Sequence, residues 1–377
     1  MNKEIYDLAQ WSIEAAKAAG ADDCRVNIDS ERFVEIGYRE RKPETIKEAS
    51  TKELDIEIYV NGRYSAQSTS DLRKEALKKF INDAVAMTKL LAEDPFRTLP
   101  DPQYYEGRKE VDLGLVDPAY KNLTPEARHE IVKEIEEACY ATGGEKVISV
   151  SAQEYDSFQE SVVLTSNGFQ GAEEATVYWA GARMAIQDEG DRRPNGYNYL
   201  AAVTKEGLPA PAEIGEVAAQ RTLDLLGGKK LKTETLPVII ENRNVSRLLG
   251  GFLAAMYGRN IQQNQSFLKD KKDQKVASDL FTIIDDPFIK GGLGSRLFDG
   301  DGFASKKRNM VEAGVVRNFY IDWYYSRKLG WEPTTGGTSN LTIPPGTRSV
   351  EEIMKDLGRG ILITGFIGGN SNSTTGD

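Results

Sequence analysis

The order of periodic patterns along the chain is the feature that most constrains its fold. Apolar residues recur every three or four positions over residues 5–16 and Gly20 follows, which predicts an amphipathic helix that ends there. Residues 54–60 alternate between apolar and polar, and Asn61-Gly62 supplies the positive-φ pair of a tight turn, so a β-hairpin is predicted. A second apolar helical stripe follows the hairpin. These patterns predict one unit of helix, strands and helix.

The same order of elements then occurs a second time. A helix is predicted from residue 124, four strands follow it, and another helix ends at Gly227-Gly228. Prolines interrupt both periodicities in the stretch between the two copies, which predicts a linker. We therefore expect an α+β protein in which a unit of helix, four strands and helix is duplicated. The expected division is an N-terminal α+β domain at 1–93, a linker at 94–120, a middle α+β domain at 121–230 and a C-terminal domain at 231–377.

The third region differs from the first two in its glycine content. A buried strand is predicted at residues 236–240 and a helix at 244–257, after which glycine becomes dense and short strands alternate with turns. This pattern predicts a glycine-rich, β-rich region. An apolar strand at residues 361–364 runs into a glycine-rich loop just before the sequence stops, so we expect the natural protein to continue.

Composition excludes several classes of partner and location. With 48 basic and 58 acidic side chains the net charge is −10, which repels nucleic-acid backbones. The N-terminus lacks the apolar core of an export signal, and no stretch approaches the roughly 20 apolar residues of a membrane span. Two cysteines, Cys24 and Cys139, are too few for a disulfide framework and are expected to be buried. We therefore expect a cytoplasmic protein that binds neither nucleic acid nor membrane.

The single histidine of the chain cannot build a histidine-ligated metal centre. His129-Glu130 begins like the zinc signature His-Glu-x-x-His, but Lys133 stands at the position of the second imidazole. At helical spacing His129 points away from the predicted apolar face, so it is expected to be exposed to solvent. Two other candidate motifs also lack residues that their function requires. Residues 299–310 lack the ligands of a calcium loop at the fifth and twelfth positions, and the glycine-rich stretches lack the rest of a phosphate-binding motif.

An ordered series of short motifs resembles a known family. The series is dispersed over the third region, and the predicted hairpin at Asn61-Gly62 is similar to that family's N-terminal hairpin. Together these motifs resemble the TldD/PmbA family, long labelled modulators of DNA gyrase. The series comprises Phe298 to Gly302, Val311 to Val315, Tyr324 to Gly330, Thr335 to Gly337, Asn340-Leu341, Pro345-Gly346, Gly365 to Asn372 and Thr375 to Asp377.

The resemblance implies a two-subunit intracellular zinc metallopeptidase that acts on unstructured peptides. In the catalytic, TldD-type subunit a His-Glu-x-x-x-His motif on a central helix holds the zinc. The similar helix here is 244–257, where the counterparts are Ser246, Arg247 and Gly251, none of which binds zinc. The resemblance therefore implies a PmbA-type (TldE-type) subunit with no catalytic, cofactor-binding or metal-binding residues of its own. Zinc is expected only in a TldD-type partner.

Two further hypotheses remain beside that of a non-catalytic subunit of a heterodimeric peptidase. One is a regulatory binding protein that acts on DNA gyrase or its inhibitors, and the other is a homodimeric metallopeptidase. Carboxylates alone suit magnesium or calcium better than zinc, which counts against the last. In the first hypothesis a peptide substrate contacts loops whose glycines allow close backbone approach. The candidate peptide-binding or interface residues are Asp299, Gly302, Arg327, Gly336, Gly337, Gly369 and Asn370.

Overall fold

A computed structural model describes residues 2–368 and 371–376 of the chain. The chain divides into two compact units, which are described separately. Unit 1 comprises Met1–Pro102, Glu110–Lys229 and Ile289–Ser295. Unit 2 comprises Gln103–Lys109, Lys230–Phe288 and Arg296–Asp377.

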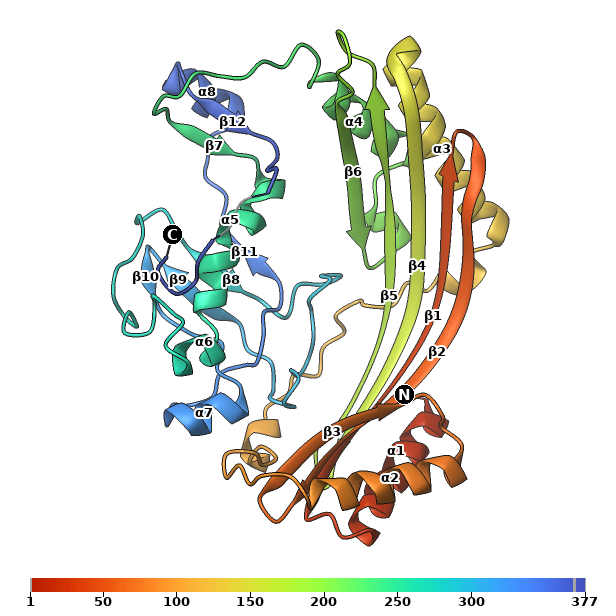
Figure 1. The fold of residues 1–377 in the computed structure, drawn as a ribbon, viewed down its shortest axis with the longest axis vertical. Helices are drawn as coiled ribbons and strands as arrows, with labels where there is room; N and C mark the ends of the chain where they lie inside the picture. Colours follow the sequence, from red (N-terminus) through yellow and green to blue (C-terminus); the bar gives the residue numbers. More distant parts are fainter. Residues whose placement is uncertain (1, 369–370, 377) are drawn as a thin grey trace. The chain divides into compact units, whose positions relative to one another are not determined.

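Unit 1 is built on one six-stranded antiparallel sheet with the strand order β3-β2-β1-β4-β5-β6 (Figure 1). Four of the strands have 17 to 19 residues. One helix precedes and one helix follows each set of three strands, so the chain runs helix, three strands, helix twice. The elements are α1 Lys3–Ala18, β1 Asp23–Arg39, β2 Lys42–Val60, β3 Arg63–Thr69, α2 Lys74–Thr88, α3 Pro125–Gly143, β4 Val147–Thr165, β5 Gln170–Ile186, β6 Asn195–Ala202 and α4 Pro211–Leu223, with short 3-10 helices at Tyr120–Asn122, Gly144–Lys146 and Lys205–Gly207. A further 3-10 helix, Pro102–Tyr105, falls almost entirely in unit 2.

The two sequence copies share this sheet instead of forming separate ones. β1 pairs antiparallel with β4 from Arg25↔Thr165 to Arg39↔Ser151, which joins the first copy to the second. Each copy contributes three strands and not the four expected, because β1 and β4 each continue through a polar stretch that the sequence pattern split in two. The linker expected at 94–120 therefore does not separate two independent sheets.

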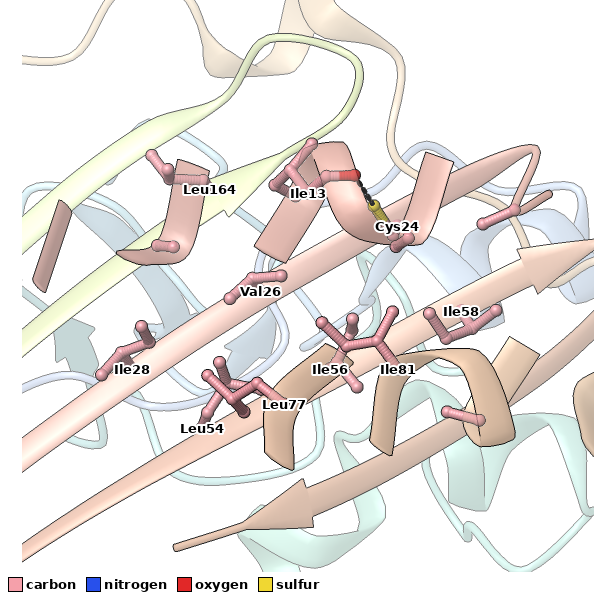
Figure 2. Packing of buried hydrophobic residues seen from close by; sticks show 14 of the residues in the cluster. Ile13, Cys24, Val26, Ile28, Leu54, Ile56, Ile58, Leu77, Ile81 and Leu164 are labelled. Atoms are coloured by element: carbon pink, nitrogen blue, oxygen red, sulfur yellow. Dashed lines mark hydrogen bonds between the residues drawn. The ribbon is translucent and has the colours of Figure 1, made fainter. Parts of the chain in front are cut away.

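The first half of the sheet is covered by α1 and α2, two helices that the sequence predicted. Apolar side chains from both helices meet the even-numbered residues of β1 and β2 in one core cluster (Figure 2). Asn61 and Gly62 both have positive φ, 49° and 72°, as the predicted hairpin turn requires. Cys24 is a buried free thiol in this cluster, which confirms the expectation for it, and burial raises its pKa to about 12. Labelled in Figure 2 are Ile13, Cys24, Val26, Ile28, Leu54, Ile56, Ile58, Leu77, Ile81 and Leu164.

The second half of the sheet is covered by α3 and α4. Even-numbered residues of β1 and β4 also line this second core cluster, so all four helices lie on the same face of the sheet. We call the opposite side the open face. The inner face of α3 differs from the expected apolar stripe, because Arg128 and Glu136 are buried on it beside Val132, Ile135 and Cys139.

Unit 2 has a third core and shorter strands. One antiparallel sheet has the order β10-β9-β8-β11, and β12 pairs parallel with β7. β10 has only two residues, and Phe319 and Tyr320, which follow it, are buried in the third core. Its elements are β7 Val238–Ile240, α5 Asn242–Ala255, α6 Gly258–Gln262, β8 Ile283–Asp285, β9 Arg308–Glu312, β10 Val315–Val316, α7 Trp323–Leu329, β11 Leu341–Thr342, α8 Val350–Leu357 and β12 Ile361–Ile363. Among the described residues, no helix is long and apolar enough to cross a membrane.

Candidate functional site

Helix α5 carries the three residues that the sequence placed in the degenerate zinc motif. Ser246 and Arg247 are exposed, and Gly251 is half-buried. A Cβ atom on Gly251 would lie 2.6 Å from the Oγ atom of Ser371, so this glycine allows residues 371–376 to pass close to the helix. Gly251 stands where the zinc motif has its second histidine, and here it makes a packing contact with Ser371 instead.

The donor set of α5 does not fit a zinc ion. Residues 242–255 include no histidine, cysteine, aspartate or glutamate, and the charged side chains on the helix, Arg243 and Arg247, are cations. Zinc requires thiolate, imidazole or carboxylate donors gathered at one point. Across residues 2–368 and 371–376 no three such side chains are placed to share a metal ion.

The candidate loop residues of unit 2 form a hydrogen-bonded cluster around one buried carboxylate. Asp299 is 5% exposed, and its carboxylate accepts hydrogen bonds from the backbone N–H groups of Asp301, Phe303 and Gly336. Gly302 has a φ of 87°, a conformation that favours glycine. Asp299 and Gly302 are buried, so a ligand cannot contact these two residues directly. It could contact these loops only at other residues.

Of the remaining candidate residues, Gly337 adjoins this cluster and Arg327 lies on α7. The guanidinium of Arg296 donates to the carbonyl oxygen of Gly337 at 2.6 Å, which fixes the loop that also includes Gly336. Arg327 is exposed on α7, with its guanidinium carbon 5.7 Å from the ring centre of Trp323. The structure thus brings Asp299, Gly302, Gly336 and Gly337 together and leaves Arg327 at the surface. Gly369 and Asn370 lie outside the described residues.

His129 is not the fully exposed side chain that the sequence suggested. It is half-buried, and its Nδ1 atom lies 3.0 Å from the hydroxyl of Tyr38 on β1. The rings of Tyr38 and His129 also meet edge to face. The expectation was wrong because β1 extends to Arg39 and reaches the N-terminal part of α3, a tertiary contact that helical spacing cannot indicate.

Between α3 and the sheet lies a buried group of charges that the sequence analysis missed. The Arg128 guanidinium forms a two-pronged ion pair with Asp156, and both side chains are at most 2% exposed. Arg128 also donates to the carbonyl oxygen of Leu123 at 2.9 Å. Such pairing is what allows two ionised groups to remain in a core.

Glu154 lies beside this ion pair and has no such partner. It is 3% exposed, and neither carboxyl oxygen accepts a hydrogen bond from a described residue. Burial, together with the nearby Asp156 carboxylate, raises the pKa of Glu154 to about 9. Two ionised carboxylates cannot bond to each other, whereas a protonated Glu154 can donate to Asp156. The group at neutral pH is therefore a neutral acid next to an ion pair.

The open face of the sheet carries a cleft of about 480 Å³ in unit 1. Trp179 is 49% exposed at this cleft. Strict alternation in β5 assigns Trp179 to the face opposite buried Tyr178 and Ala180, so the sequence pattern already contained this signal. The cleft is lined by Glu35, Gln153, Glu154, Tyr155, Val177, Trp179 and Tyr199.

The fold as a whole defines a protein of the PmbA/TldD metallopeptidase type. A crystal structure from Bacteroides thetaiotaomicron, named for a modulator of DNA gyrase, superposes with a TM-score of 0.96 at 34% identity and covers 100% of this chain and 85% of that one. The crystal structure of TldE from Thermococcus kodakarensis has a TM-score of 0.82 at 22% identity over 95% of this chain and 83% of that one, a likeness of fold.

The chain belongs to the PmbA/TldD metallopeptidase family. Residues 118–226 match the model of the PmbA/TldA metallopeptidase central domain, and residues 233–377 match that of the C-terminal domain. Metalloprotease PmbA of Escherichia coli O157:H7 is 25% identical over 100% of this chain and 83% of that protein. A PmbA homologue of Haemophilus influenzae is 26% identical over the same shares. The resemblance inferred from the sequence and the α+β fold class are both confirmed.

Proposed function

We propose that this chain is the non-catalytic, PmbA-type (TldE-type) subunit of a two-chain zinc metallopeptidase that cleaves unstructured peptides. In this proposal the TldD-type partner holds the zinc, and this chain contributes surface that binds peptide. The observation that carries the proposal is the composition of α5, whose only charged side chains are Arg243 and Arg247. A divalent cation is repelled by these side chains, and no donor on the helix offsets the repulsion.

The names of relatives support the proposal in part. One solved structure of the same fold is called TldE, and curated relatives across the whole chain are called metalloprotease PmbA. A chain of the metallopeptidase family whose helix α5 has no zinc donors fits the role of a partner subunit.

The test is to purify the chain with and without a TldD-type chain and to measure zinc content and peptide hydrolysis. We expect less than stoichiometric zinc and no hydrolysis from the chain alone. We expect the mixture to hydrolyse a fluorogenic unstructured peptide faster than the TldD-type chain does by itself. Stoichiometric zinc in the isolated chain, with hydrolysis that a chelator abolishes, would refute the proposal and favour a homodimeric metallopeptidase.

A second candidate function is regulatory binding to DNA gyrase or its inhibitors. It is favoured by the name of the 34%-identical structure from Bacteroides thetaiotaomicron, a modulator of DNA gyrase. The net charge of −10 argues that such binding would be to protein and not to DNA. Recovery of gyrase with the tagged chain in the absence of any TldD-type chain would favour this function over the first.

A further inference from the structure

The open face of the sheet in unit 1 carries an aromatic platform. Phe33 on β1 stacks with Tyr155 on β4 at a centroid distance of 5.6 Å, and Trp179 on β5 stacks with Tyr199 on β6 at 5.8 Å. Tyr197 extends the second pair at 6.1 Å from Tyr199 and is 53% exposed. Aromatic surface of this kind is unusual at a solvated sheet face and is typical of binding sites.

A glycine on β5 shapes this platform. Gly181 pairs directly with Tyr199, and a Cβ atom on it would lie 2.2 Å from the Cδ1 atom of that ring. The missing side chain lets the Tyr199 ring lie against the neighbouring strand, where it stacks on Trp179. The position of Tyr199 in the cleft thus follows from backbone packing and does not require a ligand.

One carboxylate sits among these rings. Glu35 lies in the same cross-strand row as Tyr155 and Trp179 and lines the cleft with them. No ion pair or hydrogen bond of its side chain forms within the described part of the chain. An aromatic face next to a half-buried carboxylate can hold a guanidinium or ammonium group by cation–π contact and ion pairing at once.

Charges of both signs lie on the open face. Lys47 on β2 pairs with Glu35 and its ammonium lies 4.7 Å from the centre of the Phe33 ring, and the Arg183 guanidinium lies 5.3 Å from the centre of the Tyr197 ring. Asp29 on β1 and Glu53 and Asp55 on β2 lie on this face next to one another. Burial, then the charges of Glu53 and Asp29, raise the pKa of Asp55, which shows that negative charge is concentrated there. Asp29 lies six residues along β1 from Glu35, so this acidic group does not set the sign of the ligand. The cleft itself favours a cation, because its lining carries the Glu35 carboxylate and no described lysine or arginine.

We propose that this cleft binds a lysine or arginine side chain of an extended peptide, with Trp179 and Tyr199 as the stacking surface and Glu35 as the counter-ion. The choice of a peptide rests on the proposed function, whereas the choice of a basic side chain rests on the cleft itself. At the cleft, Glu35, Tyr155 and Trp179 each pair with a residue on both neighbouring strands, so recognition there works through side chains and not through strand addition.

The experiment measures fluorescence anisotropy of labelled, end-blocked peptides with the purified chain alone. The peptides share the sequence Gly-Ser-Leu-Xaa-Leu-Ser-Gly, with arginine, alanine or glutamate at Xaa. We expect the arginine peptide to bind most tightly. Trp179→Ala should weaken that peptide about three- to tenfold, and Glu35→Gln should weaken it about three- to fivefold.

Controls separate the cleft from general effects. Glu53→Gln removes a charge from the same face outside the cleft, and Trp331→Phe changes a partly exposed aromatic residue of unit 2, so both should leave binding within twofold. Glu35→Lys should reverse the preference and bind the glutamate peptide more tightly than the arginine peptide. That reversal cannot arise from partial unfolding.

Equal binding of the three peptides, or binding unchanged by both cleft variants, would overturn the proposal. So would a dimer that Trp179→Ala dissociates and that no peptide competes with, because the platform would then be an interface between copies of this chain. Since the assay uses the isolated chain without zinc or partner, it can succeed when the subunit proposal fails, and the reverse also holds.

Discussion

The Glu154→Gln substitution tests the buried acid directly. Glu154 is 3% exposed, next to the Arg128–Asp156 ion pair, and Lys205 is the other cation that acts on it. Its pKa rises from 4.5 in the unfolded chain to about 9 in the fold. A group whose pKa is raised by folding stabilises the folded state fully at low pH. That stability is lost progressively as the pH rises from 4.5 through the folded pKa.

The magnitude follows from the proton count. Between pH 5.5 and pH 7.5 the folded chain keeps a proton on Glu154 that the unfolded chain has released, so unfolding becomes easier by ~1.4 kcal/mol per pH unit. Glutamine has a similar shape and no proton to lose. The free energy of unfolding of Glu154→Gln minus that of the parent should therefore rise by about 2.5 kcal/mol over these two pH units.

The assay is urea unfolding followed by far-ultraviolet circular dichroism at pH 5.5, 6.5 and 7.5. Glu134→Gln is the matched control, because Glu134 is an exposed residue of α3. Its free energy of unfolding, plotted against pH, should run parallel to that of the parent. If the Glu154→Gln and parent curves are also parallel, Glu154 is ionised in the folded protein and the reasoning fails.

Three further predictions concern stability and reactivity. Arg128→Met should lower the free energy of unfolding by about 3–5 kcal/mol because it leaves Asp156 buried and unpaired, and the double variant Arg128→Met/Asp156→Leu should recover most of this loss in urea unfolding. Gly62→Ala should lower it by about 1 kcal/mol because the turn holds φ at 72°, which a melting-temperature shift would reveal. Cys24 and Cys139 should react with a thiol reagent only after denaturant is added, since both are buried and burial raises the pKa of each to about 12; rapid labelling of the native chain would contradict this.

Local patterns determined much of unit 1. The hairpin at Asn61 and Gly62, helix α1 and the apolar alternation of β2 follow from conformational preference and periodicity, which act over a few residues. The absence of zinc donors on α5 also follows directly from the sequence. Because these features need no distant contact, sequence reasoning could reach them.

Other features depend on which residues meet in three dimensions. Pairing of β1 with β4 merges the two copies into one sheet, and no local pattern encodes that register. The same pairing and the packing of α3 bury Arg128 and Asp156 and leave Glu154 without a hydrogen-bond donor, although charged residues are usually expected at the surface.

The aromatic platform lies between these two cases. Alternation places Tyr197 and Tyr199 on one face of β6 and Trp179 opposite Tyr178 and Ala180 on β5, but only the strand register puts these residues and Glu35 of β1 on the same face. The sequence by itself determined the helices and the hairpin of unit 1, the family and the lack of zinc donors on α5. The tertiary structure decided which side chains share a site, because strand register and helix packing bring together residues that are far apart along the chain.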